Sequence, residues 1–275
     1  MTTTATTEDF HFLQNFIFDR SAIVLTQDKQ YLVDTRLLSV VQRAGLESIN
    51  DVVQALRRGD RGIETAVIDA MTTNETSWFR DSAPFEVLRK TIFPELIAAN
   101  VTRRRMSIWS AACSTGQELY SIAMLLDSEF SEINSWKVDL LGTDLSTAVV
   151  EKARTGRFSA LEINRGLPAS HLVRYFKRDG AQFMIADALK EKTRFETFNL
   201  VKPWPPMADF DLILLRNVLI YFDIPTKQRV LEAARGRLRP GGYLMLGTAE
   251  TTRGLVDGFS AINTGAITVF RREES

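Results

Sequence analysis

The stretch MSIWSAACSTGQE, residues 106–118, decides the fold class of this chain. Residues 106–112 are small or apolar and predict a buried strand, and a helix is expected over 117–126. The turn between them contains Gly116, where the backbone can approach a ligand closely. A strand, a tight turn and a helix in this order form one unit of a strand–helix alternation.

The same alternation continues towards the C-terminus. Further strands are expected over 136–142, 209–215 and 243–247, helices over 146–154 and 225–238, a turn over 239–242, and a terminal hairpin over 259–270. This order predicts an α/β fold with a doubly wound parallel sheet, whose ligand lies beyond the carboxyl ends of the first strands. Short alternating segments within about 174–198 predict an inserted, small antiparallel β-subdomain.

The first 72 residues read as helices only. A start signal at Thr6 precedes an apolar stripe, and a second helix is expected over 28–43, closed by Gly45. Two shorter helices are expected over 51–58 and 63–71. We therefore divide the chain into an all-helical N-terminal domain (1–72), a linker with the first helix of the larger domain (73–105), and the larger domain (106–275).

Composition excludes several classes of protein. The chain has 275 residues, 45% of them hydrophobic, which supplies a sizeable core and excludes disorder as the main state. The 34 basic and 34 acidic residues balance, which argues against a general nucleic-acid binder. One cysteine excludes an intrachain disulfide, and with two histidines it argues against a metal site. No apolar stretch approaches the ~20 residues that cross a bilayer, and the N-terminus lacks a secretory signal, so we expect no membrane insertion and a cytoplasmic location.

Three features favour a nucleotide-type cofactor, each with a plain alternative. Asp144 ends the second strand, where a carboxylate can accept two ribose hydroxyls or simply cap the next helix. Glu118 lies at the start of the first helix after the glycine turn, where it also complements the helix dipole. The turn LRPGGYL, residues 238–244, before a late strand is characteristic of class I methyltransferases, which use S-adenosylmethionine. As turn chemistry alone it would show only a helix stop and a tight turn.

Five blocks carry a resemblance that covers nearly the whole chain. They are TTNETSWFR (72–80), WSAACSTGQE (109–118), EKARTG (151–156), FNL (198–200) and LRNVLIYF (215–222). The sequence resembles the chemotaxis receptor methyltransferases, the CheR family of protein-glutamate O-methyltransferases. The resemblance implies a helical N-terminal domain, a class I (Rossmann-like) catalytic domain with an inserted β-subdomain, and S-adenosylmethionine as cofactor, with S-adenosylhomocysteine as product and no metal. It implies cofactor contacts at Asn74, Thr76, Arg80, Glu118, Asp144, Asn199, Leu200, Asn217 and Val218.

The implied reaction needs no general base. A glutamate side chain, with a reference pKa of about 4.3, is already ionised at pH 7, so the scarcity of histidine fits. A dry site and in-line positioning should accelerate its attack on a sulfonium methyl group. Our hypothesis is that Arg80 helps to hold the substrate carboxylate or the cofactor and that Tyr221 orients the reacting groups. Cys113, beside the glycine turn, is interpreted as a packed wall residue.

Two other functions stay open. An N-methyltransferase commonly carries a proline pair after the fourth strand, whereas residues 216–219 here read RNVL. A catalytically silent adaptor would share every cofactor residue, although the presence of Arg80 and Tyr221 together favours the enzyme.

The resemblance also implies partners. Lys29, Arg36 and Arg43 correspond to basic positions that meet the acidic methylation helices of chemoreceptors. The loop over 177–182 looks shorter than in relatives that bind a receptor's C-terminal pentapeptide tether, so we expect no tight tether binding. The sequence identifies neither the receptors nor a regulatory protein, and a monomer is the default.

Overall fold

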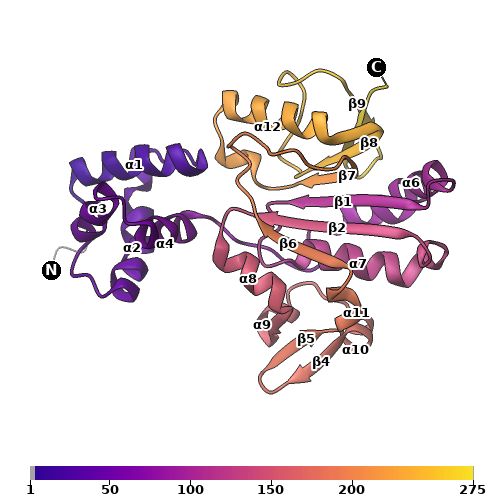
Figure 1. The fold of residues 1–275 in the computed structure, drawn as a ribbon, viewed down its shortest axis with the longest axis horizontal. Coiled ribbons are helices and arrows are strands. Elements are labelled where there is room, and N and C mark those ends of the chain that lie inside the picture. Colours follow the sequence, from indigo (N-terminus) through magenta and orange to yellow (C-terminus); the bar gives the residue numbers. More distant parts are fainter. Residues whose placement is uncertain (1–3, 275) are drawn as a thin grey trace.

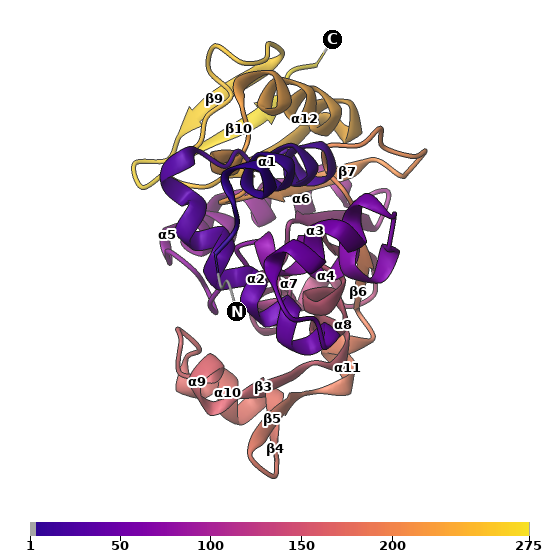
Figure 2. The same ribbon diagram turned by 90° about the vertical axis from the view of Figure 1, so that its left-hand side faces the viewer.

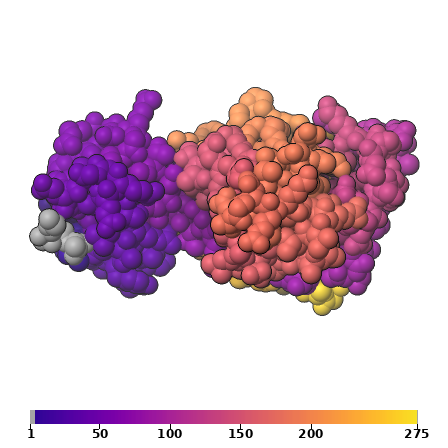
Figure 3. Space-filling view, turned by 90° about the horizontal axis from the view of Figure 1, so that it is seen from below, coloured from indigo at the N-terminus to yellow at the C-terminus, as the bar shows by residue number. Residues whose placement is uncertain are grey.

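The computed structural model describes residues 4–274, which form a helical N-terminal part and a larger part built around a seven-stranded sheet (Figure 1). The two parts lie end to end in an elongated molecule (Figure 3). No helix within residues 4–274 combines the length and the apolar content that spanning a membrane requires.

The N-terminal part consists of helices, as predicted. They are α1 (Thr7–Ser21), η1 (Gln27–Lys29), α2 (Gln30–Ala44), α3 (Ile49–Arg57) and α4 (Arg61–Met71). The Thr6 hydroxyl accepts a hydrogen bond from the backbone N–H of Asp9 and caps α1. Gly45 ends α2 with a φ of 65°, a left-handed conformation that glycine adopts without steric cost. The apolar stripes of these helices share one core, in which Phe10, Leu13 and Leu37 are fully buried.

A nearly continuous helical stretch leads from the linker into the larger part. It comprises α5 (Ala83–Val87), the π-helical turn η2 (Leu88–Ile92) and α6 (Phe93–Asn100). Its apolar side chains pack with those of α7 (Gln117–Glu129) and α8 (Thr147–Thr155) in one core, whereas α12 (Ile224–Arg237) packs in another. The two cores lie on opposite faces of the sheet, so helices cover both faces, as expected of a doubly wound fold.

The large sheet has the strand order β6-β2-β1-β7-β8-β10-β9. Its parallel strands are β6 (Thr193–Thr197), β2 (Lys137–Asp144), β1 (Arg105–Ala111), β7 (Phe210–Leu215) and β8 (Leu238–Leu246). The predicted terminal hairpin, β9 (Phe259–Asn263) and β10 (Thr268–Arg272), adds an antiparallel edge. The short helix η3 (Ser131–Ile133) precedes β2. Because the chain reverses strand order beside β1, the loops after β1, β2 and β7 meet at one end of the sheet.

Residues 239–242 were predicted as a turn before the strand, but they form a bulge inside β8 instead. Leu238 pairs with Phe210 and Tyr243 pairs with Leu212, so four residues of β8 bulge opposite one residue of β7. A side chain at Gly242 would come within 2.9 Å of the Arg239 carbonyl oxygen, which explains the glycine.

The small antiparallel sheet exists, but its membership differs from the prediction. Its order is β3-β5-β4, with β3 (Arg157–Ser159), β5 (Gln182–Ile185) and β4 (Phe176–Asp179). It is surrounded by α9 (Ala160–Ile163), α10 (Ala169–Tyr175) and α11 (Asp187–Lys190). The expectation that residues 193–198 belong to it is wrong, since β6 runs parallel to β2 in the large sheet.

Residues 193–198 were assigned to the wrong sheet because their alternation of apolar and polar residues fits a strand of either sheet. In β6 the buried Phe195 covers Gly142, where a side chain would lie 2.6 Å from the ring, while its neighbours Arg194 and Glu196 are less buried. An edge strand of a parallel sheet and a strand of a small antiparallel sheet therefore show the same period of two. Figures 1 and 2 show the small sheet at the opposite end of the larger part from β9 and α12.

Candidate functional site

A cavity lies at the carboxyl ends of β1, β2 and β7, where the fold predicts a ligand site. Its empty volume, counted out to open solvent, is about 910 Å³. Its walls come from the linker, from the loops after β1, β2, β6 and β7, and from the segment after α1. Every predicted site residue lines it: Asn74, Thr76, Arg80, Glu118, Asp144, Asn199, Leu200, Asn217, Val218 and Tyr221.

Asp144 ties two of these loops together. Its Oδ2 accepts a hydrogen bond from the Ser114 N–H at 2.8 Å, and its Oδ1 accepts one from the Ser146 N–H at 3.0 Å. Burial raises the pKa of Asp144, against the lowering effect of these backbone donors. The cap of α8 is the Ser146 hydroxyl, which accepts from Val149. Asp144 therefore does not have the capping role that was its plain alternative, and its carboxylate faces the cavity with acceptor capacity to spare.

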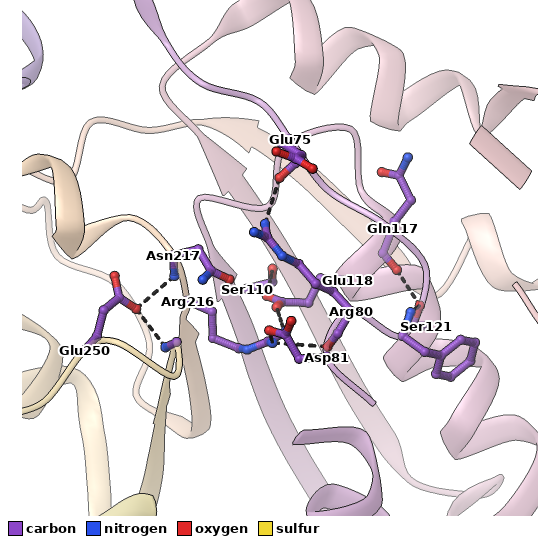
Figure 4. A network of polar contacts seen from close by, with 12 residues as sticks. Glu75, Arg80, Asp81, Ser110, Gln117, Glu118, Ser121, Arg216, Asn217 and Glu250 are labelled. Atoms are coloured by element: carbon purple, nitrogen blue, oxygen red, sulfur yellow. Dashed lines mark hydrogen bonds and ion pairs between the residues drawn. The ribbon is translucent and has the colours of Figure 1, made fainter. Parts of the chain in front are cut away.

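Glu118 belongs to a charge cluster around the buried Arg216, and both residues line the cavity (Figure 4). Its carboxylate accepts hydrogen bonds from the Ser110 hydroxyl and from Arg216 Nη1, both at 2.8 Å. Arg216 Nη2 donates to Asp81 Oδ2 at 2.7 Å and to the Arg80 carbonyl oxygen at 3.1 Å. The Arg216 side chain is only 2% exposed, so these contacts replace its hydration. Glu118 thus does more than complement a helix dipole.

Arg216 is the residue at this site that sequence reasoning missed. It lies directly after β7, where a charged side chain follows six buried residues. A long cationic side chain that follows a fully buried strand is rarely buried unless carboxylates meet it. That signal was present in the sequence, but the partners Glu118 and Asp81 lie 98 and 135 residues away along the chain.

The segment that carries Arg80 has a constrained backbone. Phe79, Asp81 and Ser82 have positive φ values of 48°, 69° and 49°, a conformation that costs non-glycine residues energy. The buried Trp78 anchors the segment, because its indole N–H donates to the Glu162 carbonyl oxygen at 3.0 Å. Arg80 Nη1 donates to the Glu75 carbonyl oxygen at 2.9 Å, which leaves the rest of its guanidinium facing the cavity (Figure 4).

The helical N-terminal part supplies one wall of the cavity. Ser21, the last residue of α1, and Ile23, just after it, line the cavity directly. The Asn199 side chain donates to the Arg20 carbonyl oxygen at 2.7 Å, and the Val24 N–H donates to the Tyr221 carbonyl oxygen at 3.1 Å. The Asn199 amide nitrogen is therefore engaged with α1, although the residue also lines the cavity.

Arg36, one of three predicted receptor contacts, faces inward. Its guanidinium donates to the carbonyl oxygens of Met71 and Thr72 at 2.7 and 3.2 Å and to the Thr73 hydroxyl at 3.0 Å. It thus binds the linker that leads to the cavity. Arg43 is exposed and folds back to the Ser39 carbonyl oxygen at 3.1 Å.

Cys113 is buried in the cavity wall. Burial, followed by the nearby charge of Asp144, raises the pKa of its thiol well above the ordinary value. A raised pKa disfavours the thiolate that nucleophilic chemistry needs, which agrees with the interpretation as a packed residue.

Comparison with known proteins covers both parts of the chain. Residues 8–72 match the family model described as "CheR methyltransferase, all-alpha domain", and residues 74–267 match "CheR methyltransferase, SAM binding domain". The chain is 39% identical to chemotaxis protein methyltransferase 1 of Pseudomonas aeruginosa, over 97% of this chain and 98% of that protein. It is 39% identical to chemotaxis protein methyltransferase Cher2 of Pseudomonas putida, over 92% of this chain and 94% of that protein. It is 38% identical to a chemotaxis protein methyltransferase of Vibrio parahaemolyticus, over 96% of this chain and 97% of that protein.

Proposed function

Since this chain belongs to the CheR methyltransferase family, a family of S-adenosylmethionine-dependent chemotaxis methyltransferases, we propose that it methylates glutamate side chains of chemoreceptors. The products are glutamate methyl esters and S-adenosylhomocysteine. The observation that carries the proposal is the convergence of ten predicted residues, drawn from five separate segments, on one cavity. We place the reaction at the cytoplasmic helices of the receptors, where it contributes to chemotactic adaptation.

The cavity fits S-adenosylmethionine. The Asp144 carboxylate has acceptor sites left for two ribose hydroxyls, and such donors would favour its charged form despite burial. The backbone at Gly116 has a φ of 92°, and a side chain there would meet the Phe195 ring at 3.0 Å, so the turn keeps its close approach only with glycine. Phe198, Leu200 and Val218 give apolar walls for an adenine ring. When bound, S-adenosylmethionine supplies an electrophilic methyl group on a sulfonium.

The charges around the cavity favour an anionic second substrate. Arg216 is neutralised by Glu118 and Asp81. Arg80 also lines the cavity, and within residues 4–274 its guanidinium meets a carbonyl oxygen and no carboxylate. A glutamate carboxylate could therefore pair with Arg80 without competing against an internal partner. We expect this pairing to be partial, because a carboxylate held too tightly loses nucleophilicity.

Tyr221, in the loop after β7, also lines the cavity. Its backbone is fixed by the bond from Val24, so its ring is positioned by both parts of the chain. With both substrates bound, we expect the apolar walls and Tyr221 to keep water from the reacting groups. Water would otherwise stabilise the separated charges of carboxylate and sulfonium more than the partly neutralised transition state. In-line positioning in such a site is worth several kcal/mol.

The test uses methyl-labelled S-adenosylmethionine and membranes that carry chemoreceptors. Label that mild alkali releases as methanol identifies a methyl ester. Arg80→Ala should lose turnover, and the matched control Arg89→Ala, at a partly exposed arginine on η2 away from the cavity lining, should keep it. Full turnover of Arg80→Ala at normal cofactor affinity would sink the role given to Arg80.

The other outcomes identify the alternatives. Alkali-stable label would indicate N-methylation and overturn the substrate class. Binding of S-adenosylhomocysteine with no label on any receptor would favour a silent adaptor.

For the receptor contact we retain Lys29 on η1 and Arg43 on α2, which lie outside the helical core, and we assign Arg36 mainly to the linker. Attraction between acidic helices and cations at the protein surface weakens as the salt concentration rises. Tight binding of a receptor's C-terminal pentapeptide is not expected. Titration of that pentapeptide onto the chain tests this, and tight binding would show the expectation to be wrong.

A further inference from the structure

The loop that carries Asn217, Val218 and Tyr221 is held from behind by a residue outside the cavity. This loop follows β7 and includes the short helix η4 (Leu219–Tyr221). Because β7 and β8 are parallel neighbours, with Leu215 opposite Leu246, the loop after β8 begins directly beside it. That second loop contains Glu250.

Both oxygens of the Glu250 carboxylate accept two backbone N–H groups each. Oε2 accepts from Asn217 at 2.8 Å and from Gly247 at 2.7 Å. Oε1 accepts from Val218 at 2.9 Å and from Ile220 at 3.3 Å. Figure 4 shows the carboxylate facing Asn217 on the side of the loop away from Arg80. A single side chain thus satisfies donors from three residues of the cavity loop and one of its own.

The loop needs such support, because its conformation is unfavourable by itself. Asn217 has a φ of 59°, in the left-handed region, and no regular strand or α-helix pairs the N–H groups that follow it. Hydrogen bonds to a charged acceptor are about twice as strong as neutral ones. Glu250 therefore offsets the local strain and selects the one conformation that presents Asn217, Val218 and Tyr221 to the cavity.

Gly247 shows how closely the two loops are fitted. A side chain there would lie 2.7 Å from Glu250 Oε2 and 2.9 Å from the Asn217 N–H nitrogen. Position 247 thus has no room for a methyl group unless the carboxylate moves away from its donors.

We propose that Glu250 is a positioning residue for methyl transfer, which acts through the backbone of the Asn217 loop and touches neither cofactor nor substrate. The inference rests on the proposed function. Glu250→Gln tests this role with little change in side-chain size, because the amide keeps one acceptor oxygen and turns an NH₂ group towards two N–H donors. We expect the Kd for S-adenosylhomocysteine to rise and kcat to fall, each by about tenfold or more.

The experiment measures that Kd by calorimetry, kcat with labelled S-adenosylmethionine and receptor membranes, and amide exchange by mass spectrometry. Exchange over the 217–220 loop should accelerate in Glu250→Gln, while β1 and β7 keep their protection. Gly247→Ala should act in the same direction by displacing the carboxylate. Glu250→Asp, which retains the charge, should recover part of the loss. Glu273→Gln, at an exposed carboxylate after β10, is the matched control and should equal the wild type.

The outcomes separate the two proposals. A wild-type chain that binds no S-adenosylhomocysteine would contradict the proposed function and remove the basis of this inference. A wild-type chain that binds and methylates, combined with unchanged Kd, kcat and loop exchange in Glu250→Gln and Gly247→Ala, would overturn the role of Glu250 alone.

Discussion

Replacing Arg216 with methionine should destabilise the catalytic part strongly, because it leaves two carboxylates without their shared cation. Methionine fills much of the volume of the arginine stem and makes no cavity comparable to that of alanine. The change therefore isolates the loss of charge and hydrogen bonds. Those bonds join Arg216 to Glu118, Asp81 and the Arg80 carbonyl oxygen.

The size of the effect follows from the exposure of the two carboxylates. Glu118 is 12% exposed and cannot regain full hydration, whereas Asp81 is 37% exposed and can turn towards water. Removing one partner of a buried ion pair costs about 3–5 kcal/mol. Because only one of the two carboxylates is well buried, we expect a value near the lower limit, about 3 kcal/mol. For a chain of this size that corresponds to a fall of roughly 6–12 °C in Tm.

Urea unfolding followed by circular dichroism measures this loss, with Arg89→Met as the control for a solvent-accessible ion pair. Adding Glu118→Gln to Arg216→Met should restore part of the stability, because the second change removes the unmatched buried charge. The double variant should therefore be less destabilised than the sum of the single variants. A loss below about 1 kcal/mol in Arg216→Met, the range of a surface pair, would refute the argument.

Three further predictions concern separate parts of the chain. Arg36→Ala should raise the Kd for S-adenosylhomocysteine about fivefold, which corresponds to the loss of one ordinary hydrogen bond, because the linker loses the contacts that Arg36 makes with it. Lys29→Ala should leave that Kd unchanged and alter only the salt dependence of receptor methylation. Gly142→Ala should lower the free energy of unfolding in urea by about 1–3 kcal/mol, since the new methyl group would lie 2.6 Å from a phenylalanine ring on β6. Burial and the hydrogen bond to Asp127 raise the pKa of Tyr175 to about 12. Because the fold favours the neutral phenol, the stability that Tyr175 contributes is complete at pH values below its ordinary pKa of about 10 and is lost as the pH rises through about 12. The urea midpoint of the wild type should therefore fall over this range more steeply than that of Tyr175→Phe. Equally steep falls in the two proteins would contradict this.

The parallel part of the sheet was predictable because its strands are long, buried and separated by helices with clear start signals. The strand before Gly116 and the strand that ends at Asp144 both lie where the period of the sequence places them. The membership of the small sheet was not predictable, because β6 and β5 share the same alternation. The parallel pairing of β6 with β2 and the contact of Phe195 with Gly142 assign β6 to the large sheet, and neither is visible along the chain.

The cavity lining was predictable because its motifs follow directly on strands, but the supports behind the lining were not. Arg216 and Glu250 act on groups far away in the sequence, and several of those groups are backbone N–H groups that carry no residue signature. Arg36 shows the opposite case. A basic residue on a helix was read as a partner contact, whereas its acceptors are linker carbonyl oxygens that the sequence does not mark.

Because the helical part contributes a wall of the cavity, it limits how chimeras between this protein and its relatives can be built. The two family models meet near residue 73, and a junction there would appear to be a natural place to join halves of two relatives. Such a chimera would pair one parent's residues 20–24 with the other parent's Asn199 and Tyr221 loops, and the backbone contacts between them would have to be matched. Receptor choice and cofactor affinity should therefore be inherited together when the helical part is exchanged, unless the segment after α1 stays with the catalytic domain that it completes.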